Sequence, residues 1–361
     1  MVFTPGSPVR WWLLWVAIPY GFIASVRARC YERGWFEQQK LPVPVFSIGN
    51  VTLGGTGKTP IVIWLTELLQ AEGKRVAVLS RGYRRTSREP MLVVSDGERL
   101  LTGPEEAGDE PYLIAKRCPK AVVAVGADRF EVGRMVLNRF CVDCMVLDDG
   151  FQHLRLHRDV NLLLIDATDP DGLQAVVPAG RLREPLSAAA RATEIVITRA
   201  EDATQVAEVT QRLHRAIGCR FEPWEVRFRP EGLYSIKTGV MHPPSWCLGK
   251  RVLLCSGIGH AGSFRSLSEG MGLSVVEEIR YVDHHHYTPV DIDSLRKKVN
   301  EVKADLVVTT EKDAGKIEPL LSPGDDNWWA VRLTTEWAAG EDRLRSVILE
   351  SLAGRQVTSC A

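Results

Sequence analysis

The sequence of 361 residues has no excess charge of either sign, because 45 Lys and Arg balance 45 Asp and Glu. A basic surface that would hold nucleic acid is therefore not expected, and the aromatic residues, 7% of the chain, are not interleaved with basic clusters. The eight cysteines are scattered along a long chain, which excludes a small disulfide-framed secreted domain and favours a reducing cytosolic setting. We infer no nucleic-acid partner and no obligatory protein partner.

The first forty residues are unusually apolar. Residues 11–26 (WWLLWVAIPYGFIASV) carry no charge, and arginines flank them on both sides. As a helix this run reaches about 24 Å, short of the roughly 30 Å hydrocarbon core, and Pro19 and Gly21 weaken its middle. We favour a helix that lies in the membrane interface, with its tryptophans at the headgroups and its arginines against anionic lipids. A transmembrane span and a buried core helix remain alternatives.

A glycine-rich loop follows a short apolar run. Residues 45–50 (VFSIGN) form an expected buried strand, and the residues after the loop have the apolar spacing of a helix. Strand, loop and helix are the context of a P-loop, in which glycines let backbone N–H groups surround phosphate oxygens. Lys58 would reach the β- and γ-phosphates, and the Thr59 hydroxyl would bind Mg²⁺. The general motif has glycine where this chain has Thr52. The candidate ATP-binding residues are Thr52, Leu53, Gly54, Gly55, Thr56, Gly57, Lys58 and Thr59.

Two adjacent aspartates follow a second apolar run. Residues 144–147 (CMVL) read as a strand that ends at Asp148 and Asp149. A strand that closes on aspartate opposite a P-loop is the Walker B arrangement, which holds Mg²⁺. Adjacent side chains of a strand point to opposite sides, so one carboxylate should face the metal and the other a different partner.

Two arginines end further strand-like runs. Arg81 belongs to SRGY and Arg129 to VGADR. The carboxyl ends of parallel strands form the ligand crevice of an open α/β sheet. Both arginines are candidates for binding an anionic substrate or the transferring phosphoryl group, and a solvated surface position is the alternative for each.

Three further motifs allow other interpretations. Residues 257–262 satisfy G-x-G-x-x-G, which is typical of a dinucleotide site but also of a tight turn. Residues 283–287 (DHHHY) suit a metal cluster, an Asp–His pair for acid–base chemistry, or an exposed loop. Residues 310–313 (TEKD) are similar to the guanine-reading motif of GTPases without its spacer. A P-loop GTPase or metallochaperone-type nucleotide switch therefore stays an alternative.

The order of these segments predicts an α/β fold with a P-loop NTPase-like, mostly parallel sheet and a second, smaller α/β lobe. We expect a membrane-associated region over residues 1–40, a nucleotide-binding domain over 41–155 and a second α/β domain over 156–305. The remaining segment, 306–361, contains a strand and a last helix from about residue 336 to 352, which would pack back on the first domain.

Taken together, the motifs resemble the tetraacyldisaccharide 4′-kinase family, the lipid A 4′-kinases of Gram-negative bacteria. The resemblance spans nearly the whole chain, and the P-loop of that family also lacks the first Walker glycine. GGTGKTP and DDGFQH together are highly specific. The motifs that carry it are the apolar N-terminal helix, GNVTLGGTGKTP, SRGY, GDEP, DDGFQH, PAGRLREP, the DHH-type loop and TEKD.

The resemblance implies transfer of the ATP γ-phosphoryl group to the 4′-hydroxyl of a tetraacylated glucosamine disaccharide 1-phosphate. Asp109 of GDEP and His284 would form a dyad that accepts the hydroxyl proton, and the imidazole would raise the basicity of the pair. The site would lie at the cytosolic face of the inner membrane, held there peripherally or by a single N-terminal anchor. The implied catalytic residues are Asp109, His284, Lys58 and Arg129; the Mg²⁺ ligands are Thr59, Asp148, Asp149 and Glu110; and Arg81, His153 and Glu184 would position substrate or stabilise charge.

Overall fold

The computed structural model describes residues 9–259 and 261–353 of the chain. Its strands join in one sheet in the order β11-β10-β12-β13-β8-β7-β6-β1-β5-β2-β4-β3, with β9 paired to β8. Neighbouring strands are parallel except for the pairs β3–β4, β8–β9 and β8–β13. The strands are β1 (Val45–Asn50), β2 (Val76–Ser80), β3 (Met91–Asp96), β4 (Val122–Gly126), β5 (Cys144–Asp148), β6 (Val160–Asp166), β7 (Glu194–Thr198), β8 (Trp224–Ser235), β9 (Met241–His242), β10 (Arg251–Ser256), β11 (Ser274–Arg280), β12 (Leu306–Thr310) and β13 (Trp328–Ala339).

Helices cover both faces of the sheet. In the first lobe α2, α4 and α10 pack on one face, and α5 and α6 pack on the other. In the second lobe α8 and α9 lie on one face and α7 on the opposite one. This arrangement confirms the predicted mostly parallel α/β fold. The helices are α1 (Leu14–Glu32), α2 (Lys58–Ala71), α3 (Pro104–Ala107), α4 (Asp109–Arg117), α5 (Arg129–Arg139), α6 (Ala203–Ile217), α7 (Ala261–Gly270), α8 (Pro289–Val302), α9 (Glu311–Ile317) and α10 (Glu341–Ala353), with short 3₁₀ turns at Trp11–Leu13, Pro170–Leu173, Leu186–Arg191, Pro244–Cys247 and Glu318–Leu320.

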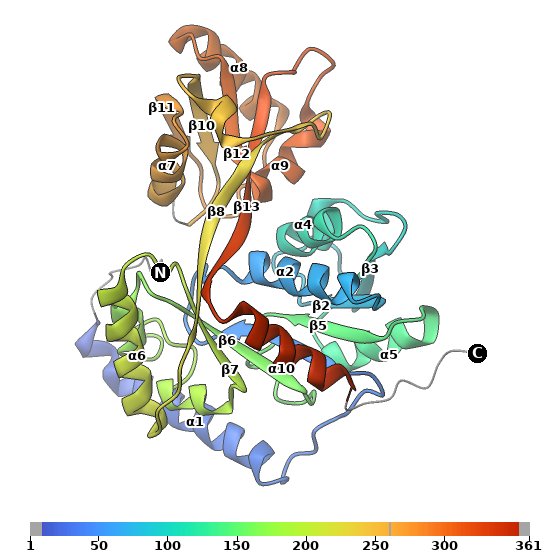
Figure 1. Ribbon diagram of the computed structural model, residues 1–361, viewed down its shortest axis with the longest axis vertical. Coiled ribbons are helices and arrows are strands. Elements are labelled where there is room, and N and C mark those ends of the chain that lie inside the picture. Colours follow the sequence, from blue (N-terminus) through green and yellow to red (C-terminus); the bar gives the residue numbers. More distant parts are fainter. Residues whose placement is uncertain (1–8, 260, 354–361) are drawn as a thin grey trace.

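The two lobes are joined by the long antiparallel pair of β8 and β13, which runs from one lobe to the other (Figure 1). The expected boundary at residue 155 falls between β5 and β6, and these two strands are the direct neighbours of β1 in the same sheet. Because β5 and β6 both pair with β1, they belong to the same lobe, and we place the boundary between the lobes within β8 and β13 instead of at residue 155. The last helix begins at Glu341 rather than near residue 336, because residues up to 339 pair with β8.

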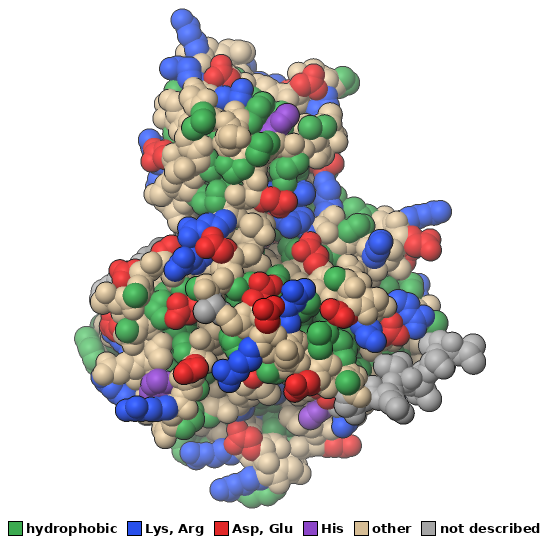
Figure 2. Space-filling view, viewed as in Figure 1, with side chains coloured by type: hydrophobic (Ala, Val, Ile, Leu, Met, Phe, Trp, Pro, Cys, Tyr) green, Lys and Arg blue, Asp and Glu red, His purple; other side chains and the backbone are tan. Residues whose placement is uncertain are grey.

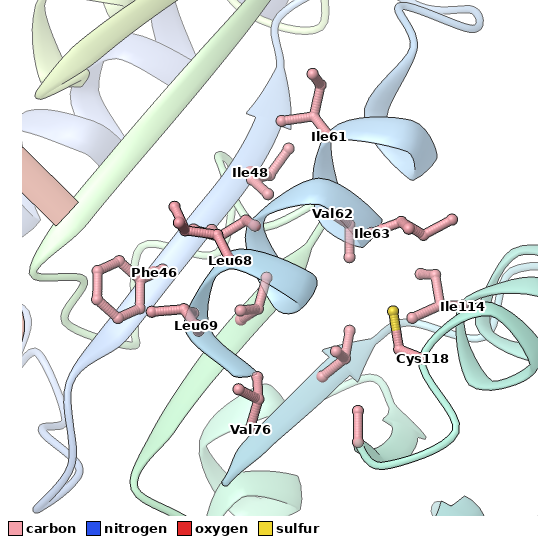
Figure 3. Packing of buried hydrophobic residues seen from close by; sticks show 14 of the residues in the cluster. Phe46, Ile48, Ile61, Val62, Ile63, Leu68, Leu69, Val76, Ile114 and Cys118 are labelled. Carbon is pink, nitrogen blue, oxygen red and sulfur yellow. The ribbon is translucent and has the colours of Figure 1, made fainter. Parts of the chain in front are cut away.

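The core of the first lobe lies between β1 and the helix that follows the P-loop (Figure 3). Phe46 and Ile48 of β1 and Leu69 of α2 are fully buried in one cluster. Leu344 and Ile348 of α10 join the same cluster, so the C-terminal helix packs on the first lobe. The strand at residues 306–310 does not, because β12 lies between β10 and β13 in the second lobe.

The apolar N-terminal segment forms one helical stretch, Trp11–Glu32, whose 22 residues are long and apolar enough to cross a membrane. It continues through Pro19. One face contacts the segment around residues 175–185, and the other exposes large apolar side chains. Elsewhere the visible surface is mixed: Figure 2 shows acidic and basic side chains interspersed over one face, as the balanced composition predicts. Residues 1–8 of the expected N-terminal region lie outside the described part.

Candidate active site

The P-loop connects β1 to α2, as predicted. Gly54 and Gly57 have φ of +115° and +78°, values that favour glycine. The Lys58 ammonium lies 3.4 Å from Asn50 Oδ1 and 3.5 Å from Asp149 Oδ1. Two carbonyl groups of the loop accept hydrogen bonds from arginines that also line the cavity: Arg181 donates to Leu53 O, and Arg199 donates to Gly55 O. These two side chains support the loop.

The tandem aspartates have different hydrogen-bonding partners. Asp148 ends β5 and is buried, and Ser80 Oγ donates to its Oδ2 at 2.7 Å. Among the described residues no partner reaches Asp148 Oδ1. Burial raises the pKa of Asp148 to about 7, and the nearby acids Glu110 and Asp149 add to this effect.

Asp149 has a left-handed backbone, with φ of 54°, which turns its carboxylate toward basic groups. Arg183 Nη1 donates to both of its oxygens, at 2.8 and 3.0 Å. Burial raises the pKa of Asp149, but the charges of Lys58 and Arg183 outweigh burial and lower that pKa to about 2. Asp149 therefore stays ionised.

These oxygen groups suit Mg²⁺. A buried carboxylate oxygen without a partner in the described chain, together with further carboxylates and a hydroxyl, is the hard donor set that Mg²⁺ prefers. The described residues contain no group of three or more His, Cys, Asp or Glu side chains that would form a complete metal cage. Mg²⁺ needs no such cage, because it binds through one or two carboxylates together with phosphates and water.

Asp109 and His284 meet across the two lobes. Asp109 is the first residue of α4, and His284 lies in the loop between β11 and α8, with φ of 61°. His284 Nδ1 is 3.0 Å from Asp109 Oδ2, and Lys316 Nζ donates to the same oxygen at 3.2 Å. Burial raises the pKa of Asp109, but the hydrogen bond from His284 and the charge of Lys316 outweigh it and lower that pKa to about 2.

This low pKa differs from the expectation that the imidazole raises the basicity of the carboxylate. A donor that binds the charged form of an acid stabilises that form and lowers its pKa. Asp109 is therefore ionised near neutral pH and orients His284 through Nδ1. The other ring nitrogen of His284, Nε2, is on the side away from Asp109.

The other predicted residues are partly engaged by neighbours. Arg129 is 6% exposed and donates to the carbonyls of Ala127 and Asp149. Glu184 accepts from Gln152 at 2.9 Å and from Arg191 at 2.6 Å. For His153, burial and the charge of Arg129 lower the pKa to about 4, so its ring is neutral near pH 7.

One cavity of about 1570 Å³ brings most of these residues together. It extends from the P-loop to α1 and to the second lobe. Thr52 and Thr56 do not line the cavity, because both side chains are buried. Asp109 does not line it either, but it is hydrogen-bonded to His284, which does. The predicted residues that line it are Leu53, Gly54, Gly55, Gly57, Lys58, Thr59, Arg81, Glu110, Arg129, Asp148, Asp149, His153, Glu184 and His284.

Several residues of the site were missed by sequence reasoning. Ser80 and Arg183 lie inside motifs that were recognised, SRGY and PAGRLREP, so their positions were signalled but their partners were not. Lys312 and Lys316 lie in and just after TEKD, a motif compared above with a guanine motif and counted toward the family resemblance, with no role assigned to either lysine. Gly257 also has a role: its N–H donates to Asp313 and its carbonyl accepts from the His284 N–H. Residue 260 of that turn lies outside the described residues.

The fold and this cavity define a P-loop phosphotransferase. A family model of tetraacyldisaccharide-1-P 4′-kinases matches residues 9–353. A tetraacyldisaccharide 4′-kinase of Syntrophus aciditrophicus is 40% identical over 297 residues, which cover 80% of this chain and 79% of the relative. A second, from an Anaeromyxobacter species, is 38% identical over 93% of this chain and 90% of its own length.

A solved structure agrees with this match. LpxK from Aquifex aeolicus, crystallised in complex with ATP, is 32% identical with a TM-score of 0.77, over 95% of this chain and 99% of the crystallised one. The chain belongs to the tetraacyldisaccharide 4′-kinase family, and it is an enzyme of lipid A biosynthesis that transfers a phosphoryl group to an alcohol. Because the chain belongs to this kinase family, its interpretation as a nucleotide switch or as a dinucleotide-binding enzyme has no support.

Proposed function

We propose that this enzyme transfers the γ-phosphoryl group of ATP to the 4′-hydroxyl of a tetraacyl glucosamine disaccharide 1-phosphate at the cytosolic face of the inner membrane. The observation that carries the proposal is the single cavity that joins the P-loop, the tandem aspartates and His284 to the N-terminal helix. A lipid substrate needs such continuity, because its acyl chains stay in the bilayer while the sugar enters the cleft.

ATP would bind with its phosphates on the backbone N–H groups of residues 54–59, and Lys58 would neutralise their charge. Thr59, Asp148, Asp149 and Glu110 would hold Mg²⁺, which, when bound, neutralises the charge that develops on the transferring group. Lys58 is also paired with Asp149, at 3.5 Å. This ion pair holds the ammonium at the mouth of the loop.

His284 would accept the hydroxyl proton at Nε2, while Asp109 holds Nδ1 and stabilises the imidazolium. Phosphoryl transfer requires mainly alignment and positive charge, and Arg129 and Arg81 line the cavity on the side of α5 and β2. His153, which is neutral near pH 7, and Glu184 would position the sugar by hydrogen bonds.

The helix at the N-terminus would seat the cleft at the membrane. Tyr20, Ala24 and Arg27 of α1 line the cavity, so the helix forms part of its wall. The arginine would bind an anionic lipid headgroup or the 1-phosphate of the substrate.

The test is a transfer assay with purified protein in detergent, ATP, Mg²⁺ and the lipid disaccharide 1-phosphate. Asp109→Ala and His284→Ala should each lower kcat by about 10²-fold or more, within the usual range for loss of general-base catalysis. Lys58→Ala should nearly abolish transfer. His286→Ala, in the same loop, is the matched control and should behave as wild type. Wild-type turnover in the Asp109 and His284 variants would refute the dyad, and absence of transfer by the wild-type enzyme would refute the proposed reaction.

A further inference from the structure

The TEKD motif at residues 310–313 contacts the imidazole of the candidate base. Lys312, the second residue of α9, lies with its Nζ 3.3 Å from His284 Nε2 and 3.5 Å from Glu110 Oε1. Its side chain is 19% exposed and lines the cavity. The TEKD motif, which is similar to a guanine-binding motif, thus places the Lys312 ammonium beside Nε2 of His284.

The chemistry of this contact determines where the proton of the neutral imidazole lies. An ammonium has three donors and no acceptor, so His284 Nε2 must accept from Lys312. An ionised carboxylate only accepts, so Nδ1 must carry the proton and donate it to Asp109 at 3.0 Å. The two partners, one on each side of the ring, select the same tautomer.

A second carboxylate near Nε2 would favour a proton there, but it lies beyond hydrogen-bond distance. Asp283 Oδ2 is 3.8 Å from Nε2, farther than the Lys312 ammonium, and Arg84 donates to the Asp283 backbone carbonyl. Tyr83 meets the imidazole edge-on, with 5.7 Å between ring centroids. The backbone of His284 is held separately, because its N–H donates to Gly257 O.

The anchoring of α9 holds the backbone of Lys312 in place beside the loop that carries His284. Lys316, one turn later and 5% exposed, binds both Asp109 Oδ2 and Asp313 Oδ1, at 3.2 and 3.0 Å. Asp313 is fully buried and accepts from the Gly257 N–H at 2.9 Å. The same short helix therefore fixes Asp109, the turn that holds His284, and the ammonium on Nε2.

We propose that Lys312 is a positioning residue that holds His284 in the Nδ1–H tautomer, so that the lone pair needed for proton acceptance is on Nε2. The inference rests on the proposed function. When the sugar hydroxyl enters, it replaces the ammonium at Nε2. Its proton passes to Nε2 as its oxygen bonds to the γ-phosphorus and the bond from that phosphorus to the β,γ-bridging oxygen breaks. The imidazolium, stabilised by Asp109, then releases the proton to water.

The experiment compares Lys312→Met, which keeps length without a donor, with Lys312→Arg, which keeps a donor-only cation. Lys116→Met, which breaks an exposed ion pair between α4 and Glu318, is the matched control. The tautomer of His284 is read from ¹⁵N shifts of protein labelled at histidine, without substrate, and the His284→Ala spectrum identifies its signals. kcat and KM for ATP are then measured for each variant.

Wild type and Lys312→Arg should show a protonated Nδ1 and an unprotonated Nε2, and Lys312→Met should show a mixture. Lys312→Met should lower kcat by about 10-fold or more with KM for ATP unchanged, less than the roughly 10⁴-fold that a wrong tautomer costs in a serine protease. Lys312→Arg should recover most of the rate, and Lys116→Met should match wild type.

An Nε2–H tautomer in the wild type would overturn the inference. So would a Lys312→Met variant that loses activity with its tautomer unchanged, because the lysine would then act only through its charge. The tautomer is measured without substrate, so failure of the wild type to phosphorylate the disaccharide would refute the proposed function while the spectra still decide the role of Lys312.

Discussion

At the scale of single residues, Asp148 and Asp149 show how neighbours determine the charge of adjacent carboxyl groups. Asp148 is buried and Asp149 is partly buried, yet the pKa of Asp148 is raised to about 7 and that of Asp149 is lowered to about 2. Burial acts on both in the same direction, so the difference comes from Arg183 and Lys58, which contact Asp149. A divalent cation would supply the positive charge that Asp148 lacks.

The raised pKa of Asp148 predicts a stabilising substitution. Between pH 4 and pH 7 the metal-free folded protein keeps a proton on Asp148 that the unfolded chain releases, so its stability falls as pH rises. Asp148→Asn removes this loss and should increase the free energy of unfolding at pH 8 by a few kcal/mol, since each pKa unit corresponds to about 1.4 kcal/mol. At pH 4 the two proteins should be equally stable.

Urea unfolding in the presence of a chelator, at several pH values, measures this difference. The same variant should lose most of its Mg²⁺-dependent transfer, because stability and function make opposite demands on a metal-binding acid. Asp326→Ala, an exposed acid paired with Lys237, is the control and should not alter the pH dependence. Equal stability of Asp148→Asn and wild type at pH 8 would show that folding does not raise the pKa of Asp148.

At the scale of elements, α4 and α9 dock through a set of matched charges. The acids at the start of α4, Asp109 and Glu110, pair with lysines of α9, and the basic residues at its end pair with acids. The acids at its N-terminus and the cations at its C-terminus also suit the dipole of α4. This contact closes the second lobe over the first beside the site. The pairs are Asp109–Lys316, Glu110–Lys312, Lys116–Glu318 and Arg117–Glu311.

Of the two acids on the α9 side, Glu311 should matter much more for stability. It is 10% exposed and accepts from Arg117 and from Arg332, both at 3.0 Å. Glu311→Ala leaves two largely buried guanidinium groups without this partner and should lower the free energy of unfolding by about 3 kcal/mol. Glu318→Ala breaks an exposed pair and should cost less than about 1 kcal/mol. Urea titration of both variants provides the measurement, and equal losses would contradict the argument.

The sequence predicted the helices and strands that have local signals, but it did not predict the order of the strands in the sheet. The P-loop, the strand before Asp148 and the strand at residues 306–310 are apolar runs bounded by turn residues, and all three form. The pairing of β6 with β1 could not be read in this way, because every buried parallel strand has the same apolar composition. Lys312 could not be assigned either, since its partner His284 is 28 residues away and is brought to it only by the packing of α9.

At the scale of the whole molecule, the linking strands contact the nucleotide loop. Phe228 of β8 lies against Gly57, where an added Cβ would come 2.3 Å from its ring. The lobes thus meet at several places that border the site, among them this contact, the docking of α4 with α9, and the contact of Tyr83 with His284. A change in the P-loop therefore acts directly on the strands that connect the lobes.

The N-terminal helix packs on the rest of the protein along one face. Ala17 and Gly21 face the protein, where a Cβ at Gly21 would lie 3.3 Å from Val176, and the Tyr20 hydroxyl donates to Arg183 O at 2.9 Å. A helix docked along one face cannot be surrounded by lipid, so its length alone does not make it a span. The other face of α1 exposes large apolar side chains, which favours a helix that lies in the plane of a membrane interface. The exposed apolar residues are Trp11, Trp12, Trp15, Ile18, Phe22 and Ile23.

The double substitution Trp15→Ser and Phe22→Ser should therefore weaken membrane binding without changing the fold. The two side chains are 75% and 66% exposed, so they add little to the core and leave their apolar area available to lipid. Burying a large apolar side chain is worth about 1.5 kcal/mol or more, so partition into anionic vesicles should fall by roughly 10-fold or more. Leu248→Ser, at a residue of the second lobe that is 71% exposed, should leave partition unchanged. Cosedimentation with vesicles decides the matter: if both variants bind as wild type does, the exposed stripe of α1 does not enter the bilayer, and the cleft is brought to its lipid by another surface.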